Sequence, residues 1–406
     1  MLNLEKARAR MEEEGLDALI ALSLPNVYFT TGYHSHFAEL VKEHIRPVVV
    51  PRDKNLEPFI ICPDFEIEDF STYSRIRNFV PFPTEVYIKF DPGAGDHHAE
   101  AVKAAKNIDL SPLKGVDLHT GLVRQPLLFL AKELKDRDLD KTVLGVDSRT
   151  VLPSASWEEV KKALPYATIV DADEVFTDLR MVKSAEELGF ISEATRITQE
   201  GIESIIPLIK PGAIHSEIVG QLRKALSGGY SELWELSVDI AGAPATAVTD
   251  DRLKNGDILL VDIGAKYKKY CADVSRVYPV GEPSKEFRKA YDVVVEAEEA
   301  MIRAIKPGAK ASELYDIGMA IVRKMDPDYR RGHLGHGLGV ELHEKPYLAR
   351  GAKDFILEPG IALTVEIPYY WWGHFGCNLE DTLIVTEDGY KYAAGPALNR
   401  ELIVSE

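Results

Sequence analysis

The chain has 406 residues, of which 45% are hydrophobic and 28% charged, which is typical of globular proteins and excludes global disorder. Acidic side chains outnumber basic ones by 65 to 48, and the net charge of −17 argues against surfaces for nucleic acids or anionic membranes, because both require clustered Lys and Arg. The length favours two or three domains. Three cysteines cannot form a disulfide framework and fit a reducing compartment. With no secretory h-region and no membrane-length apolar run, the sequence predicts a cytoplasmic protein.

The first 180 residues alternate between extended and helical patterns. Leu4, Ala7 and Met11 recur at helical spacing before Gly15, which indicates a first helix. Strands are expected at Ala18–Leu22, Val48–Val50, Phe59–Cys62 and Thr142–Val146, and further helices at Gln125–Leu134 and Ser156–Ala163. Strands that alternate with helices predict an N-terminal α/β domain, which we assign to residues 1–178.

A second domain is expected from residue 179 to residue 406. The boundary falls in the segment Phe176–Lys183, directly before the sequence Ser184-Ala-Glu-Glu187. That sequence is a capping box, which marks the start of a helix.

The second domain contains an internal repeat. The segment Ile209–Ile218 recurs as Ile305–Leu314, with the same residues at most positions, and each copy lies between helical patterns. A β-rich stretch follows each copy, at Asp257–Val280 and Ile361–Val385. Two copies predict one domain of two related halves, because a solenoid would need at least three.

Each β-rich stretch carries a pair of carboxylates. Asp262 lies within an apolar strand pattern, and a hairpin that turns near Tyr267–Lys268 would place Asp273 opposite it. A hairpin that turns at Gly373 would pair Glu366 with Glu380 in the same way.

Four buried carboxylates in one place are unstable without cations, so these residues predict a metal site. Carboxylate oxygens favour hard divalent metals, and a nitrogen ligand extends the choice to Mn²⁺, Co²⁺, Fe²⁺ or Zn²⁺. His336 and His343 lie in the glycine-rich stretch Gly335–Glu344 and can supply that nitrogen, and His333 lies close by. The glycines would let the backbone approach a metal or a substrate closely.

These stretches resemble the pita-bread metallopeptidases, which include methionine aminopeptidase, aminopeptidase P and prolidase, with creatinase as a metal-free relative. The resemblance covers most of residues 184–406, and a weaker one, at Asn26–Gly32, links the N-terminal part to the small domain of creatinase and prolidase. It implies an α/β N-terminal domain and an α+β pita-bread catalytic domain with an internal pseudo-twofold duplication. The matching stretches are Gly256–Ala265, Asp273–Arg276, Gly335–Glu344, Leu357–Ile361, Thr364–Glu366 and Glu380–Thr382.

The resemblance also implies a dinuclear metal site with Mn²⁺ or Co²⁺, or alternatively Zn²⁺ or Fe²⁺. Asp262 would chelate one metal, Asp273 and Glu380 would bridge both, and His336 and Glu366 would complete the other. A metal-bridging hydroxide would attack the scissile carbonyl. His343 would stabilise the tetrahedral intermediate, and Glu366 would also pass a proton to the leaving nitrogen.

Two positions depart from the pattern of proline-specific members. Ala245 stands where they usually carry a substrate-binding histidine, and Asn378 where they usually carry an arginine. The implied substrates are small peptides, above all those of an Xaa-Pro dipeptidase or aminopeptidase. The departures favour an alternative in which the same site acts on a non-peptide small molecule, as in ectoine hydrolase or a dimethylsulfoniopropionate lyase. A non-enzymatic relative, such as a histone chaperone subunit, would lack the ligands that this chain retains.

Further residues are candidates for contact with the substrate or with a second subunit. The resemblance to creatinase-like dimers implies a homodimer, in which Tyr33, His34, His36 and Arg46 could reach the neighbouring active site. Cys271 and Cys377 flank the ligand strands and are expected to be small buried residues. The candidate substrate-binding residues are His333, Tyr369, Tyr370 and Asn378.

Overall fold

The computed structural model divides the chain into two compact units, Met1–Arg180 and Met181–Glu406, and each is described by itself. No helix among the described residues is long and apolar enough to cross a bilayer. The residues that the structure describes are 1–40, 45–84, 108–109, 111–113, 124–147, 158, 161–162, 164–240, 242, 247–351 and 354–404.

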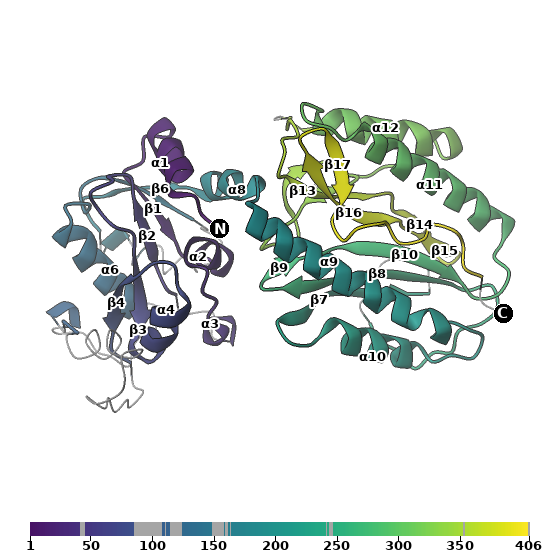
Figure 1. Ribbon diagram of the computed structural model, residues 1–406, viewed down its shortest axis with the longest axis horizontal. Helices are drawn as coiled ribbons and strands as arrows, with labels where there is room; N and C mark the ends of the chain where they lie inside the picture. Colours follow the sequence, from purple (N-terminus) through teal and green to yellow (C-terminus); the bar gives the residue numbers. More distant parts are fainter. Residues whose placement is uncertain are drawn as a thin grey trace. The chain divides into compact units, whose positions relative to one another are not determined.

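A six-stranded sheet forms the centre of the N-terminal unit (Figure 1). Its order is β4-β3-β2-β1-β5-β6, in which β2 pairs antiparallel with β1 and β3 while the other neighbours are parallel. The strands are β1 (Ala18–Ala21), β2 (Val48–Pro51), β3 (Phe59–Pro63), β4 (Asn78–Phe82), β5 (Val143–Val146) and β6 (Thr168–Asp171). The helices are α1 (Leu4–Glu13), α2 (Leu24–Thr31), α3 (His36–Leu40), α4 (Ile67–Tyr73), α6 (Arg124–Asp136) and α8 (Asp173–Met181).

Helices cover both faces of this sheet, as an α/β domain requires. One face packs against α1, α4 and α8, and the other against α6. The expected first helix, the four strands and the helix at Gln125–Leu134 are confirmed, although Leu4 is exposed and only Ala7 and Met11 of its stripe are buried. Most of the helix expected at Ser156–Ala163 lies outside the described residues.

The C-terminal unit is built on a nine-stranded sheet with the main order β12-β11-β13-β16-β10-β8-β7. Helix pairs pack on its two halves, α9 and α10 against β7 and β8, and α11 against β13 (Figure 1). The helices are α9 (Ala185–Ile205), α10 (His215–Leu226), α11 (Lys285–Ala304) and α12 (Ala311–Met325). The strands are β7 (Ser231–Asp239), β8 (Ile258–Tyr267), β9 (Tyr270–Cys271), β10 (Val274–Pro279), β11 (His336–Gly337), β12 (Glu344–Tyr347), β13 (Ala362–Glu366), β14 (Tyr369–Trp371), β15 (Phe375–Cys377), β16 (Glu380–Thr386) and β17 (Gly389–Tyr392).

The repeat in the sequence is also a repeat in backbone hydrogen bonding. Gly212 N–H donates to the Leu253 carbonyl at 2.7 Å, and in the second copy Gly308 N–H donates to the Leu357 carbonyl at 2.9 Å. Both glycines have a φ of 84°, in the left-handed region that disfavours a side chain. Each Pro-Gly turn therefore ties the start of a helix to the segment that enters a β-hairpin, and the expected pair of related halves is confirmed.

Strand β8 shows how one sheet serves both the core and the site. Leu259, Val261 and Ile263 point to one face and are buried in the core beneath α9 and α10. Asp262 lies between them in sequence and therefore points to the opposite face. The period-2 alternation of a strand thus holds a carboxylate in place on a rigid, well-packed element.

The capping box at Ser184 gives a prediction about the start of α9. The Glu187 N–H donates to Ser184 Oγ at 3.4 Å, and the Ser184 N–H donates to Glu187 Oε2 at 2.8 Å. Loss of such a cap costs about 1 kcal/mol, so we expect Ser184→Ala to speed amide hydrogen exchange in the first turn of α9 about fivefold. Mass spectrometry of peptides from this region measures the rate.

Ser227→Ala is the matched control, because this exposed serine lies directly after the end of α10 and outside α9. An unchanged exchange rate in Ser184→Ala would show that the cap contributes nothing.

Candidate metal centre and active site

Acidic residues form a row across four neighbouring strands of the C-terminal sheet. Asp262 of β8 lies opposite Ser275 of β10, Ser275 lies opposite Glu380 of β16, and Glu380 lies opposite Glu366 of β13. Directly opposed residues in a sheet point to the same face. Three carboxylates from three strands are thereby directed to one face of the sheet by backbone register alone.

The first hairpin is confirmed, but its expected register is wrong by two residues. Asp273 does not lie opposite Asp262, since the chain turns through Lys268 and Lys269, whose φ values are 45° and 65°. This turn of two left-handed residues moves the pairing so that Ser275 faces Asp262. Asp273 precedes Ser275 by two residues and so remains on the same face, diagonal to Asp262.

The second hairpin has the predicted register. Glu366 pairs with Glu380, and the connecting ribbon of β14 and β15 turns around Gly373, whose φ is 75°. Cys377 at the end of this ribbon is fully buried with a free thiol, as is Cys271, in agreement with the expectation for both.

His336 completes the group from β11, next to β13 in the sheet. A Cβ on Gly335 would collide with the Thr364 carbonyl, and one on Gly337 would collide with the Lys345 carbonyl. The flanking glycines are thus required because β11 is packed tightly between its neighbours. This close approach places the His336 imidazole over the row of carboxylates.

The orientation of His336 leaves a nitrogen lone pair for a cation. His336 Nδ1 lies 3.0 Å from the Gly337 carbonyl and must carry the proton to donate to it. Nε2 is then unprotonated and lies 3.6 Å from Asp273 Oδ2 and 3.7 Å from Glu380 Oε1. Burial is the main cause that lowers the pKa of His336, to about 4, so the ring is neutral at pH 7.

Mutual repulsion between carboxylates at this site favours the binding of a cation. Burial raises the pKa of Glu380 well above its usual value, and the negative charges of Asp273, Glu366 and Asp262 raise it further. Glu380 Oε1 is buried and accepts no hydrogen bond within the described part of the chain. Ligand atoms of Asp273, His336 and Glu380 lie within 4.8 Å of one another. Oxygens and an imidazole nitrogen that converge in this way suit a divalent cation.

Two threonines hold the backbone of these candidate ligands. Thr364 and Thr382 are a cross-strand pair on β13 and β16. The Thr382 hydroxyl donates to the Asp273 carbonyl at 2.7 Å, and the His336 N–H donates to Thr364 Oγ1 at 3.3 Å. Ligands on different strands are thus tied to one another through the sheet.

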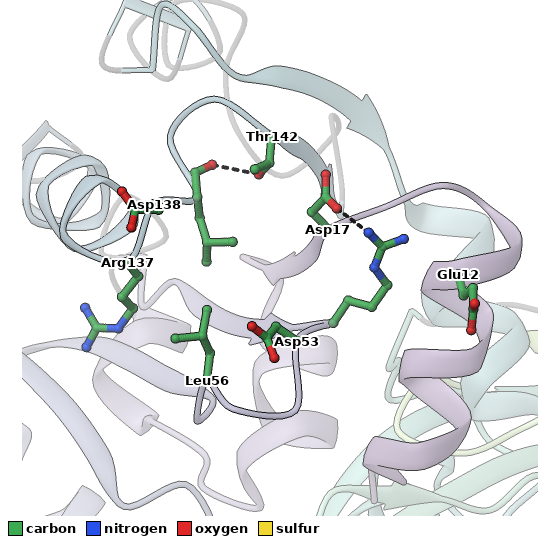
Figure 2. Close-up of a pocket in the computed structure, with 9 residues that line it drawn as sticks. Glu12, Asp17, Asp53, Leu56, Arg137, Asp138 and Thr142 are labelled. Atoms are coloured by element: carbon green, nitrogen blue, oxygen red, sulfur yellow. Dashed lines mark hydrogen bonds and ion pairs between the residues drawn. The ribbon is translucent and has the colours of Figure 1, made fainter.

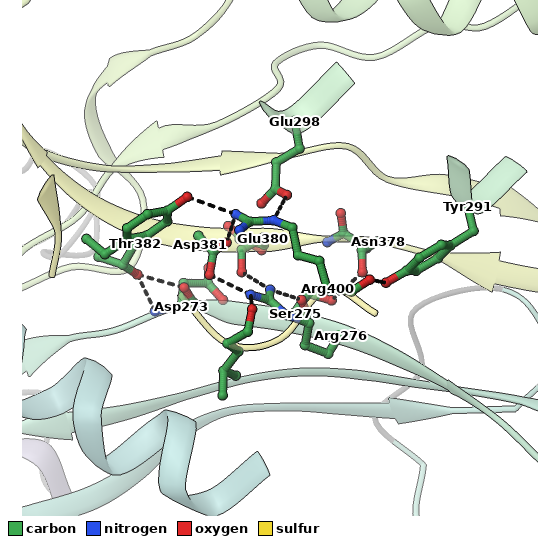
Figure 3. Close-up of polar contacts among 12 residues, drawn as sticks. Asp273, Ser275, Arg276, Tyr291, Glu298, Asn378, Glu380, Asp381, Thr382 and Arg400 are labelled. Carbon is green, nitrogen blue, oxygen red and sulfur yellow. Dashed lines mark hydrogen bonds and ion pairs between the residues drawn. The ribbon is translucent and has the colours of Figure 1, made fainter. Parts of the chain in front are cut away.

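A buried ionic network supports the row from its other face (Figure 3). Asp381 follows Glu380 on β16 and receives hydrogen bonds from both Arg276 and Arg400. Arg276 also donates to the Glu380 carbonyl at 2.9 Å, and Arg400 donates to Glu298 of α11 at 2.8 Å. The C-terminal segment that carries Arg400 is thereby attached directly behind the acidic row, and every charge in the network is paired.

The three predicted histidines lie together at the edge of the site. The ring centroids of His336 and His343 are 4.1 Å apart, and those of His333 and His343 are 6.1 Å apart. His333 Nδ1 lies 3.1 Å from Glu366 Oε1. Burial opposes the ionisation of Glu366, but the nearby His333 and Arg331 outweigh it and lower the pKa of this carboxyl group.

The remaining candidate substrate residues separate into two groups. Tyr370 lies near the carboxylates, since burial and then the charges of Asp262 and Glu366 raise the pKa of its hydroxyl. Asn378 is fully buried, with Nδ2 3.5 Å from Asp262 Oδ2. Tyr369 points elsewhere, because its hydroxyl donates to Asp326 at 3.1 Å. Ala245 lies outside the described residues.

Next to Tyr370 is a cavity of about 570 Å³. Arg331 lies on its wall, with Nη2 3.5 Å from Glu366 Oε2. Neither Arg331 nor Arg400 was among the predicted site residues, because an isolated arginine gives no sequence signal of which carboxylate it will meet. The cavity is lined by Asp326, Asp328, Tyr329, Arg330, Arg331, Pro368, Tyr369, Tyr370 and Trp371.

The N-terminal unit has its own cavity, of about 610 Å³ (Figure 2). Several of its polar residues are engaged in structural contacts; Asp17, for example, pairs with Arg52 and also accepts a hydrogen bond from the Val143 N–H at 3.0 Å. This arrangement suggests no chemistry.

The N-terminal residues that were expected to reach a second subunit are partly structural. Arg46 is buried and binds Glu66 through two hydrogen bonds of 2.6 Å. His34 and His36 both pair with Glu39, at 2.8 Å and 3.1 Å. Arg46 is therefore unable to reach a neighbour without breaking a buried ion pair, whereas His36 is exposed.

Comparison with known proteins identifies the class of molecule that this fold and site define. Residues 189–387 match the profile of metallopeptidase family M24, and residues 3–182 match the creatinase/prolidase N-terminal domain. An Xaa-Pro dipeptidase of Pyrococcus horikoshii is 30% identical over 254 residues, which cover 61% of this chain and 72% of the relative. The chain belongs to metallopeptidase family M24.

Solved structures confirm the expected architecture of an α/β N-terminal domain followed by a pita-bread domain. The Xaa-Pro dipeptidase from Bacillus anthracis superposes with a TM-score of 0.77 at 24% identity, over 99% of both chains. The prolidase from Pyrococcus horikoshii superposes with a TM-score of 0.76 at 23% identity, over 98% of this chain and 99% of that one.

The low pKa of His336 gives a prediction for the metal-free protein. An unfolded histidine takes up a proton near pH 6.5, whereas folded His336 does so only near pH 4. Protonation therefore favours unfolding, and the contribution of this residue to stability falls as the pH drops from about 6.5 to about 4. NMR titration of the ring signal, assigned with His336→Gln, should give a pKa of about 4. A value of 6.5 or above would contradict the buried, neutral ring.

Proposed function

We propose that the C-terminal unit is a dinuclear metallopeptidase that hydrolyses the bond before proline in small Xaa-Pro peptides. This proposal rests mainly on the row of carboxylates formed by Asp262, Glu380 and Glu366, with Asp273 and His336 beside it. Carboxylates this close together require cations. The relatives and structural neighbours, which include Xaa-Pro dipeptidases and prolidases, support the choice of substrate.

Five side chains would hold the two cations. Asp262 would bind one, Asp273 and Glu380 would bridge both, and His336 and Glu366 would bind the other. Two divalent ions would supply a water molecule that ionises near neutral pH and a Lewis acid that polarises the scissile carbonyl. Mn²⁺ or Co²⁺ is the proposed pair, with Zn²⁺ or Fe²⁺ as the alternative for the same oxygen and nitrogen donors.

The other residues would act on protons and on developing charge. His343 is exposed at the edge of the site, next to His336, and would donate a hydrogen bond to the oxyanion of the tetrahedral intermediate. Glu366 would carry a proton to the leaving nitrogen. Its lowered pKa keeps it ionised before the reaction, as a proton acceptor must be. His333, Tyr370 and Asn378 would contact the substrate, and Tyr369 would line the pocket from further away.

A second candidate function keeps the metals and changes the substrate. Asn378 is buried against Asp262, where common Xaa-Pro enzymes were expected to carry an arginine, so this position offers no positive charge to a substrate. A small non-peptide amide, or the substrate of a lyase, is the alternative. We also infer a homodimer in the cytoplasm, because the resemblance implies pairing of subunits and the three free cysteines fit a reducing compartment.

Removal of one ligand tests the metal site. We expect Asp262→Asn to lose metal and activity together, because an amide binds a divalent cation far more weakly than a carboxylate. Metal content is measured by mass spectrometry after dialysis, and turnover is measured before and after chelation. Asp292→Asn, at an exposed position on α11, should change neither. Full turnover by a metal-depleted sample would refute the proposal.

A substrate panel separates the two candidate functions. The enzyme, reconstituted with Mn²⁺ or Co²⁺, is assayed on Xaa-Pro dipeptides, longer Xaa-Pro peptides and matched Xaa-Ala dipeptides. We expect cleavage of Xaa-Pro dipeptides with kcat/KM at least about tenfold above that of Xaa-Ala, since shape discrimination in an apolar pocket reaches about 10–200-fold. Two bound metals per chain without cleavage of any proline peptide would favour the non-peptide substrate.

A further inference from the structure

Arg331 has hydrogen-bonding capacity that the protein itself does not use. Its Nη2 lies 3.5 Å from Glu366 Oε2, longer than the 2.7–2.9 Å of a charge-assisted hydrogen bond. Its Nε is buried and has no hydrogen-bond partner within the described residues. The side chain is still 32% exposed and lines the cavity of about 570 Å³ beside Tyr370. A partly exposed guanidinium with unused N–H donors can bind an anion from solution.

The charges of the site indicate that the anion comes from outside. Asp262, Asp273, Glu366 and Glu380 would carry four negative charges, and two divalent cations would balance all four. Glu366 would then be neutralised by metal and would no longer be the main partner of Arg331. The guanidinium could then bind one further carboxylate in the cavity, whose wall also carries Asp326, Asp328 and Arg330.

The location of this charge fits one group of a peptide. In a dipeptide, the C-terminal carboxylate is two bonds beyond the scissile nitrogen, so it must lie close to the metal ligands. Arg331 is a neighbour of Glu366, which would protonate that nitrogen. In a longer peptide the same position holds a neutral amide. The aromatic side chains of Tyr369, Tyr370 and Trp371 on the cavity wall offer apolar surface to a pyrrolidine ring.

We propose that Arg331 binds the C-terminal carboxylate of the substrate and makes this enzyme a dipeptidase. The inference rests on the proposed peptidase function. It also accounts for Asn378, because the positive charge that is absent from that position is supplied by a different loop, directly before the glycine-rich stretch that carries His336.

The first test compares kcat/KM for an Xaa-Pro dipeptide with that for its C-terminal amide. Loss of a charge-assisted pair predicts that the wild type prefers the free acid by about 10–100-fold. In Arg331→Met we expect this ratio to fall to about one, because only the free acid loses a charged partner, whereas any effect of the substitution on Glu366 acts equally on acid and amide. Arg331→Lys should keep part of the preference, because an ammonium retains charge without the bidentate geometry.

Lys324→Met is the matched control, since it removes one positive charge from an exposed position on α12. It should keep the wild-type ratio, whereas a fall equal to that of Arg331→Met would mean that the overall field of the protein sets the preference and would overturn the proposal. Equal wild-type values for acid and amide would also overturn it, without recourse to any variant. A preference retained by Arg331→Met would do so as well, with the peptidase function intact.

A binding measurement keeps the test independent of turnover. L-Proline and L-prolinamide are titrated calorimetrically into the metal-loaded wild type, Arg331→Met and Arg331→Lys, after circular dichroism and metal content have shown that each variant is folded. Tighter binding of proline that disappears in Arg331→Met supports the carboxylate site even if the wild type cleaves no peptide, an outcome that would refute only the peptidase function. Equal binding of proline by the wild type and Arg331→Met refutes the carboxylate site.

Discussion

The catalytic unit depends on the concentration of negative charge on one face of one sheet. Strand register fixes the backbone positions of Asp262, Glu380 and Glu366, and none of these positions can shift without breaking backbone hydrogen bonds. In the absence of cations this arrangement is electrostatically unfavourable, as the raised pKa of Glu380 shows. The sheet therefore imposes a repulsion that bound divalent cations would relieve, and this would couple the fold to the chemistry of metallopeptidase family M24.

The opposite face of the same sheet carries a carboxylate whose charge is neutralised. Alternation along β16 turns Glu380 toward the site and Asp381 toward the core, where two arginines neutralise it. Arg276 also donates to the Glu380 carbonyl, so the ionic network acts directly on the backbone of a proposed ligand. Attachment of Arg400 to this network makes the C-terminal segment part of the catalytic scaffold (Figure 3).

Different elements supply the side chains around the row of carboxylates. Histidines from the segment between α12 and β12 lie at one side of the carboxylates, and the ribbon of β14 and β15 brings Tyr370 to them. Arg331 joins these two regions by its position beside Glu366 and on the cavity wall. In our proposal, substrate length is thereby selected by a residue outside the ligand set.

Much of this could be predicted from the sequence, because it depends on short-range patterns. Strand alternation identified Asp262 as a carboxylate within a buried strand, although its own side chain is only partly buried. The symmetric spacing about Gly373 predicted the pairing of Glu366 with Glu380, and the repeated Pro-Gly turn predicted two related halves. Glycine-flanked histidines pointed to His336. These signals are local or internally repeated, so they survive without knowledge of the three-dimensional structure.

Tertiary structure decided the rest, for physical reasons that differ between residues. The two-residue turn at Lys268 and Lys269 set the register of the first hairpin. Both lysines adopt left-handed backbone conformations, which a sequence normally signals by Gly, Asn or Asp and not by Lys. The opposition of Ser275 and Glu380 joins the two halves, and no local pattern encodes a pairing between strands so far apart in the chain. The carboxylates that Arg331 and Arg400 contact could not be predicted, because only the packing of the folded chain determines which acidic side chain lies next to a given arginine.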